Sequence, residues 1–223
     1  MISKSYYNYH LKTLVISDTH LDNKFEQKKF DFLAHLFLRF DQIILNGDFW
    51  DGYLCSFESF INSPWKNLFP ILKSKNTIYI YGNHDPQNTA NSKTSLFSQI
   101  QTHHYKLKHK DKNIDIMHGH QIVKTFDLNL SLPLKKKIFH TADLTYNIMT
   151  KMMKEKFWEM LMERYTHKFY EYIEKENVDC LICGHTHCPS QKKDNFINSG
   201  MVNYGIAHYV EIEDEIRLIK TKY

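Results

Sequence analysis

Short apolar runs recur along the chain, and a polar residue ends each of them. Each run is rich in β-branched or aromatic residues and is too short for a helix, which predicts a β-strand. Five such runs occur at residues 11–17, 42–46, 77–81, 114–117 and 178–182. Two more runs, 209–212 and 215–221, flank Glu213-Asp214 and predict a closing hairpin.

Helical spacing of apolar residues separates the first predicted strands. Between residues 25 and 40, Phe30, Leu33 and Phe37 recur three and four positions apart, as on one face of a helix. Residues 57–73 are also predicted to be helical, and Pro64 is expected to break the helix or to start a turn. The alternation of strands and helices predicts an α/β fold.

The length and the hydrophobic content predict one domain. The chain has 223 residues, of which 42% are hydrophobic, and this is enough for one sizeable core. We therefore expect a single domain over residues 1–223, with a helical insertion at about 122–177.

The insertion has two interpretations. Residues 134–176 contain no Gly or Pro, and their apolar residues fall at helical spacing. One interpretation is a helix packed on the core. The other is a helical lid whose Phe157 and Met160 contact a lipid-like substrate, because Met suits adaptable surfaces.

Charge and hydropathy argue against some classes of protein. The formal net charge of +4 is mild and comes without a basic and aromatic binding motif, so nucleic acid is not expected as a partner. No apolar run is long enough to cross a bilayer, and residues 1–12 have no signal-peptide core. Together these features predict a cytoplasmic protein.

The cysteines leave two interpretations. Three of the 4 cysteines crowd into residues 180–188 and do not form the spaced framework of a disulfide protein. Cys180 and Cys183 have the spacing of a small zinc site. The alternative is two buried thiols, because residues three apart in a strand point to opposite faces.

The residues that end the five predicted strands share a chemistry. The first three ends carry acid or amide groups, and four of the five carry histidine. A turn explains a lone Asp or Gly, but it does not explain this repetition. Because ligand sites gather where loops leave the carboxyl ends of strands, we predict a metal site. Its motifs are Asp18-Thr19-His20, Gly47-Asp48, Gly82-Asn83-His84-Asp85, His118-Gly119-His120 and Gly184-His185-Thr186-His187.

The motifs supply a mixed set of oxygen and nitrogen ligands without thiolates. Such a set suits Mn, Fe, Zn or Ni better than Mg or Ca, which prefer oxygen alone. It holds too many ligands for one tetrahedral zinc ion. Shared between two ions through a bridging carboxylate, the set suits a hydrolytic centre that clamps a phosphoryl group. We therefore expect two divalent ions, with Mn²⁺ first among the candidates.

In this order the motifs resemble those of the calcineurin-like metallophosphoesterases, and they span most of the chain. The resemblance implies a four-layer αββα sandwich with a dinuclear metal centre at one edge. It implies that one ion is held by Asp18, His20 and His187. The other ion would be held by Asn83, His118 and His185, with Asp48 bridging the two.

The resemblance also implies roles for residues that do not hold metal. His84 matches the family's histidine that contacts the phosphate or protonates the leaving group, and Asp85 would orient it. Asp51 would support its loop and would not bind metal. In the pair His118 and His120, the family uses the first histidine as a ligand, while the second contacts substrate or metal.

One branch of the family resembles this chain further. The UDP-2,3-diacylglucosamine diphosphatases of lipid A synthesis also have a helical insertion between the last two histidine motifs, and their loop is similar to Gly47-Asp48-Phe49-Trp50-Asp51. Two positions differ, because that branch carries Arg in place of His84 and tends to carry Asp in place of His120. The resemblance implies a phosphate-containing, lipid-linked substrate and peripheral contact with the inner face of the membrane.

Two other functions stay open at this point. One is a general phosphodiesterase or phosphatase that acts on nucleotides or nucleic acid. The other is a scaffold protein that has kept the sandwich and lost catalysis. The scaffold is disfavoured because all seven inferred ligands and His84 are present.

Overall fold

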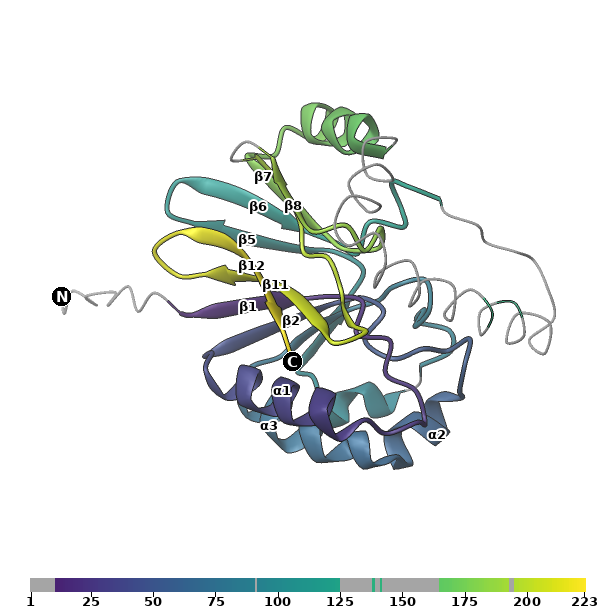
Figure 1. Ribbon diagram of the computed structural model, residues 1–223. Helices are drawn as coiled ribbons and strands as arrows, with labels where there is room; N and C mark the ends of the chain where they lie inside the picture. The colour runs from purple at the N-terminus through teal and green to yellow at the C-terminus, as the bar shows by residue number, and fades with distance from the viewer. Residues whose placement is uncertain (1–10, 91, 125–137, 139–140, 142–164, 193–194) are drawn as a thin grey trace.

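Two β-sheets stack in the middle of the molecule, and helices lie on both outer sides (Figure 1). This computed structural model describes residues 11–90, 92–124, 138, 141, 165–192 and 195–223. The arrangement confirms the predicted α/β fold with four layers in the order αββα.

The first sheet carries the amino-terminal strands and the closing hairpin. Its strands are β1 Thr13–Ile16, β2 Gln42–Asn46, β3 Ile78–Ile80, β4 Ile100–Thr102, β10 Val202–Asn203, β11 Ile206–Ile212 and β12 Ile216–Lys222. Their order is β10-β11-β1-β2-β3-β4, and β12 pairs with β11. Because β1 to β4 run parallel, their carboxyl ends lie at one edge of the sheet.

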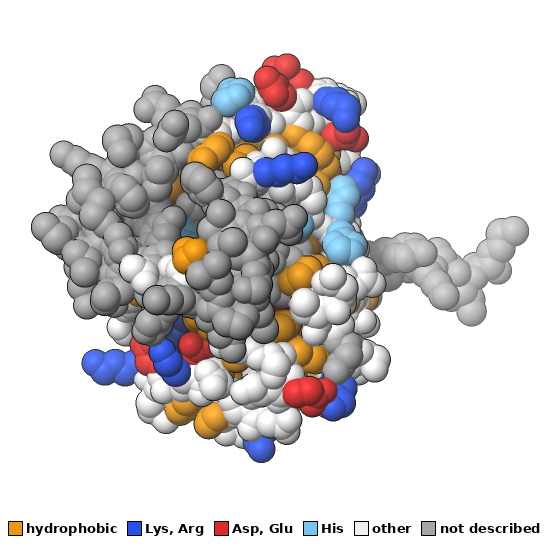
Figure 2. Space-filling model, turned by 90° about the vertical axis from the view of Figure 1, so that its right-hand side faces the viewer, with side chains coloured by type: hydrophobic (Ala, Val, Ile, Leu, Met, Phe, Trp, Pro, Cys, Tyr) orange, Lys and Arg blue, Asp and Glu red, His pale blue; other side chains and the backbone are white. Residues whose placement is uncertain are grey.

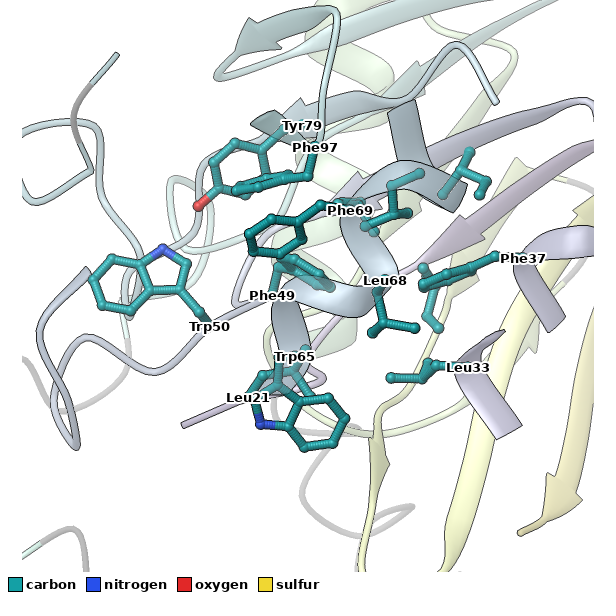
Figure 3. Close-up of a cluster of buried hydrophobic side chains, with 14 of the residues drawn as sticks. Leu21, Leu33, Phe37, Phe49, Trp50, Trp65, Leu68, Phe69, Tyr79 and Phe97 are labelled. Atoms are coloured by element: carbon teal, nitrogen blue, oxygen red, sulfur yellow. The ribbon is translucent and has the colours of Figure 1, made fainter. Parts of the chain in front are cut away.

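Helices follow the parallel strands and cover the outer face of this sheet. They are α1 Gln27–Leu38, α2 Phe57–Asn62, α3 Phe69–Ser74 and the 3-10 helices η1 Pro64–Leu68 and η2 Ser92–Leu96. Pro64 starts η1 directly after α2 ends, which confirms the predicted break. Phe37, Trp65 and Phe69 from these helices are buried with Trp50 and Tyr79 in one aromatic core (Figure 3).

The second sheet contains β5 Tyr105–His109, β6 Lys112–Ile116, β7 Cys180–Cys183, β8 Ser190–Lys192 and β9 Phe196–Asn198, in the order β5-β6-β7-β9-β8. Aliphatic side chains such as Ile44, Ile116 and Ile182 fill the space between the two sheets. On the outer face, Phe169 and Ile173 from the helical residues 165–176 complete a third core.

Cys180 and Cys183 point to opposite sides of the second sheet. Cys180 packs into the core between the sheets, whereas Cys183 packs under the outer helix. Neither forms a disulfide, both are buried, and within the described ranges no candidate metal group includes a cysteine. The interpretation as buried thiols is therefore confirmed.

The structure adds strands that the sequence analysis did not predict. Phe196–Asn198 is the strand β9, because β7 and β8 lie on either side and supply its hydrogen-bond partners. The strands β4, β8 and β10 were not predicted because they have only two or three residues each. The strand β5 was also not predicted, although Tyr105 and Leu107 alternate with lysines.

The predicted insertion at 122–177 is only partly described. Residues 165–176 are helical, while Phe157 and Met160 lie outside the described residues. Of the helices in the described ranges, none has the length and apolar character needed to cross a membrane.

Candidate metal centre

The five polar motifs meet where β1, β2, β3, β6 and β7 end. Their acidic and histidine side chains form three overlapping groups, and within each group one ligand atom per residue lies within 4.8 Å of the others. The groups are Asp18, His20 and His187; His20, Asp48 and His84; and Asp48, His118 and His185. Figure 2 views the molecule from the side towards which β1 points in Figure 1.

Asp18 lies directly after β1 and is fully buried. Its Oδ2 accepts the backbone N–H of His185 at 3.0 Å. Its Oδ1 lies 3.1 Å from Nε2 of His187 but has no hydrogen-bond partner among the described residues. Nε2 of His187 also lies 3.2 Å from Nε2 of His20. Two ring nitrogens and a buried carboxylate oxygen that converge in this way fit a divalent cation.

Asp48 lies between the two remaining groups. Its Oδ2 is 3.2 Å from Nε2 of His118 and 3.9 Å from Nε2 of His20. Its Oδ1 accepts the backbone N–H of His84 at 2.9 Å. Asn83 Oδ1 approaches the same His118 Nε2 at 3.1 Å. A carboxylate in this position can contact cations on both sides.

Backbone and side-chain acceptors orient the histidine rings. Nδ1 of His118 faces the Asn46 carbonyl oxygen at 2.9 Å, and Nε2 of His185 faces the Val123 carbonyl oxygen at 2.9 Å. Each of these nitrogens therefore carries the proton, which leaves the other ring nitrogen as an acceptor for a cation. Burial and the nearby His118 lower the pKa of His185 to about 3, so this ring is neutral.

Asp51 lies between two histidine rings. Its Oδ2 is 3.2 Å from Nδ1 of His20, and its Oδ1 is 3.1 Å from Nδ1 of His84. Burial raises the pKa of Asp51, but the charges of His84 and His20 outweigh burial and lower that pKa below its ordinary value. With Nδ1 of both rings directed at Asp51, Nε2 of each lies about 4 Å from Asp48 Oδ2, at 3.9 Å for His20 and 4.0 Å for His84.

The contact predicted between Asp85 and His84 is corrected by the structure. The Asp85 carboxylate accepts backbone N–H groups of Asp48 at 2.9 Å, Phe49 at 2.7 Å and Gly82 at 2.7 Å. Both oxygens are therefore occupied by backbone donors, and Asp51 is the carboxylate beside the His84 ring. Through these hydrogen bonds, Asp85 holds the backbone of the loop that carries Asp48. Burial and the charge of Asp48 raise the pKa of Asp85 to about 7.

The backbone at the site is strained. Left-handed φ values, which are costly for residues with a side chain, occur at Asp18 (53°), His20 (44°), Asp48 (52°), His185 (68°) and His187 (57°). Hydrogen bonds between the loops hold this conformation, for example from Asp18 N–H to the Gly47 carbonyl at 3.1 Å. Such strain clusters at functional sites because it directs several side chains to one point.

Two sequence-predicted substrate contacts lie outside the described residues, and a third lies near the cluster. His120 has its ring centroid 5.5 Å from that of His118 and 6.2 Å from that of His185, so it borders the three groups without belonging to them. Phe157 and Met160 belong to the undescribed part of the insertion.

Asn198 supports the last histidine loop and was not singled out from the sequence. It is fully buried, and its Nδ2 donates to the Gly184 carbonyl at 2.7 Å and to Thr186 Oγ1 at 3.1 Å. The signal that could have revealed it is its place in Asn198-Ser199-Gly200 after two apolar residues, since Asn, Ser and Gly favour turns at the end of a strand.

Fold and site together define the class of this protein as a metal-dependent phosphoesterase. The sequence model of the family described as calcineurin-like phosphoesterase matches residues 11–189, and the chain belongs to this family. No curated protein matches the sequence.

Solved structures share the fold at low sequence identity. An archaeal phosphodiesterase is 18% identical with a TM-score of 0.50, and the match covers 95% of this chain and 100% of that one. YfcE, a phosphoesterase from E. coli, is 15% identical with a TM-score of 0.47 and coverages of 95% and 99%. Vps29 from Entamoeba histolytica, solved with zinc, is 17% identical with a TM-score of 0.47 and coverages of 95% and 99%.

Proposed function

We propose that this chain hydrolyses phosphoester or pyrophosphate bonds with two divalent ions. Asp18, His20 and His187 would hold one ion, Asn83, His118 and His185 the other, and Asp48 would contact both. The observation that carries the proposal is the position of Asp48 Oδ2, which is 3.9 Å from His20 Nε2 on one side and 3.2 Å from His118 Nε2 on the other. Two ions held there would polarise a phosphoryl oxygen and lower the pKa of water.

His84 is suited to donate a proton to the leaving oxygen. Burial lowers the pKa of His84, but the charges of Asp51 and Asp48 outweigh it and raise this pKa to about 9. In the metal-free chain, the His84 ring is therefore protonated at neutral pH. Because Nδ1 faces Asp51 at 3.1 Å, Nε2 is the nitrogen that presents its proton to substrate.

Metal depletion tests the centre directly. Chelated protein should regain activity with Mn²⁺, and its metal content by mass spectrometry should rise to two ions per chain; Fe, Zn and Ni are the alternatives to compare. A protein that hydrolyses aryl phosphodiesters equally well after complete chelation would refute the proposal. Full loading without any hydrolysis would instead favour a scaffold.

For the substrate we propose an amphiphilic, nucleotide-linked diphosphate, with UDP-2,3-diacylglucosamine as the first to test. The support is the similarity of the loop Gly47-Asp48-Phe49-Trp50-Asp51 and the place of the insertion between His118 and His185. On the face in Figure 2, described hydrophobic side chains are visible between charged ones. A substrate that carries acyl chains is anchored in a membrane. Acting on it would therefore bring the protein into peripheral contact with that membrane.

The substrate proposal is tested by competition between matched compounds. Each acyl methylene that becomes buried would add about 0.8 kcal/mol, so the acylated sugar should exceed UDP-N-acetylglucosamine in kcat/KM by orders of magnitude. Phe157→Ser combined with Met160→Ser should remove this preference while hydrolysis of an aryl phosphodiester persists. Equal kcat/KM for acylated and bare sugars would indicate a general phosphodiesterase.

A further inference from the structure

Tyr53 packs on the ring of His84 and belongs to no sequence motif. Its ring centroid lies 4.2 Å from that of His84, with the two planes tilted by 45°. The side chain is half-buried, so it borders the site and is not part of the aromatic core under the sheet.

The backbone around Tyr53 is tied to His84 and to Asp51. Tyr53 N–H donates to Asp51 Oδ1 at 2.9 Å, and Gly52 N–H donates to the His84 carbonyl at 3.0 Å. A Cβ at residue 52 would collide with that His84 carbonyl, so the close approach requires Gly52. These backbone contacts hold the main chain of residues 52 and 53 against His84 and Asp51, and they place the Tyr53 ring beside the His84 ring.

The Asp51 contact alone does not determine the orientation of the His84 ring. It restrains one atom, Nδ1, at 3.1 Å, while the χ2 torsion of histidine has broad energy wells. The plane of the ring needs packing on its faces and edges. His20 supplies an edge contact at a centroid distance of 4.5 Å and an angle of 83°, and Tyr53 supplies the other contact.

We propose that Tyr53 is a positioning residue that holds the His84 ring in the plane required for proton donation to the leaving oxygen. This inference rests on the proposed function of His84. Proton transfer needs Nε2 aligned with that oxygen, and a small misplacement costs rate while substrate binding through phosphate is unaffected. The ring of Tyr53 is what matters here, so Phe should replace it and Leu should not.

The experiment compares Tyr53→Leu, Tyr53→Phe and His84→Asn in Mn²⁺-loaded protein. The substrates are methyl aryl phosphodiesters whose leaving phenols span a range of pKa values. Tyr53→Leu should lower kcat roughly 10-fold to 100-fold for the poorest leaving group and less than about 2-fold for nitrophenol, with KM and metal content unchanged. Tyr53→Phe should restore the wild-type dependence. Phe25→Leu, which loses a partly exposed ring packed on Phe30 and Trp65, is the matched control and should match wild type.

A second readout does not depend on activity. In zinc-loaded protein, the nuclear Overhauser contact between the ring protons of His84, assigned by their absence in His84→Asn, and those of His20 should weaken in Tyr53→Leu and persist in Tyr53→Phe. An unchanged contact in Tyr53→Leu, or a rate loss that is equal for all leaving groups, would overturn the positioning role. If His84→Asn itself shows no dependence on the leaving group, proton donation by His84 fails, and this contact alone then decides whether Tyr53 positions the ring.

Discussion

At the scale of single residues, the neighbours of each donor decide what it can do. His118 and His84 both lie near Asp48, yet His118 has its Nδ1 on a backbone carbonyl while His84 has its Nδ1 beside Asp51. The carbonyl holds the Nδ1 proton of His118, so its Nε2 can bind a cation once that nitrogen is deprotonated. Asp51 favours the protonated form of His84, because a carboxylate stabilises the imidazolium form.

Asp48→Asn tests the bridging position. An amide removes a negative charge and places an NH₂ group or a single carbonyl oxygen between the two groups, so both cations should bind more weakly. We expect turnover to fall by several orders of magnitude and metal content to drop below two ions per chain. Asp31→Asn, on the exposed face of α1, is the control. A near-native rate with two bound ions in Asp48→Asn would contradict the assignment.

Asp85 should support the stability of the fold, whereas Asp51 should support turnover. Asp85→Asn would turn an NH₂ group towards backbone donors at 2.7–2.9 Å, and leaving buried donors unsatisfied costs about 1–3 kcal/mol each. We expect Asp85→Asn to lower the free energy of unfolding by about 2–4 kcal/mol. Urea unfolding of the metal-free protein measures this.

Asp51→Asn is the matched comparison for Asp85→Asn. Asp51→Asn should mainly slow the turnover of substrates with poor leaving groups, because it changes the partner of His84 Nδ1. If the two substitutions exchanged these effects, the original prediction that Asp85 orients His84 would be restored.

At the scale of elements, close contacts between loops bring the ends of strands from different sheets together. A Cβ at Gly184, directly after β7, would collide with Oδ2 of Asp18 and with the side chain of Ser17, and both of these residues follow β1. The contact brings the ends of two strands from different sheets together. It explains why a glycine precedes His185.

Gly184→Ala should therefore push the β1 and β7 loops apart. We expect a folded protein with clearly weaker metal binding, measured by competition with a fluorescent chelator. Gly205→Ala is the control: its φ of 78° makes alanine costly by about 1 kcal/mol, but a Cβ there meets only the Tyr223 carbonyl oxygen at 4.0 Å and no residue of the metal groups. Unchanged metal affinity in Gly184→Ala would show that the loops tolerate the extra methyl group.

At the scale of the whole molecule, two sheets bring carboxylates and imidazoles into one buried cluster whose charges must balance. Without metal, burial lowers the pKa of His118, but the charges of Asp48 and Asp18 outweigh it and raise this pKa to about 10. A protonated His118 thus partly neutralises the acidic side chains until a cation replaces the proton.

Metal binding should release protons and strengthen as the pH rises. Because His118 is protonated in the metal-free chain up to a pKa of about 10, the apparent affinity for Zn²⁺ should increase from about pH 6 to about pH 9. Calorimetry in buffers of different ionisation enthalpy counts the protons released. An affinity that is independent of pH, with no proton release, would contradict this charge balance.

The stability of the metal-free fold should fall as the pH rises, which is the opposite of the change expected for metal affinity. A folded-state pKa of about 10 for His118, above the unfolded value of about 6.5, stabilises the fold fully below about pH 6.5, and this contribution is lost as pH rises through 10. Bound metal should remove that loss, because the cation then supplies the positive charge.

The sequence by itself determined the strands β1, β2 and β3 of the first sheet and the polar motifs that follow them. Strands such as 42–46 end in charged or amide residues after continuous apolar runs, and this signal is local, so it survives without any knowledge of partners. Family membership followed from five such motifs in order. Short edge strands such as β4 and β8 carry no comparable signal, since pairing with a neighbour is what makes them strands.

Only the tertiary structure decided which side chains face each other. Asp51 and Asp85 are both acids close to a site histidine, and Asp85 adjoins His84 in sequence. Left-handed turns and the close approach at Gly52 bring Asp51 and Tyr53 to the His84 ring and turn Asp85 to the backbone of the Asp48 loop. Side-chain direction within a turn depends on loops from distant strands, and such contacts leave no periodic trace in the sequence.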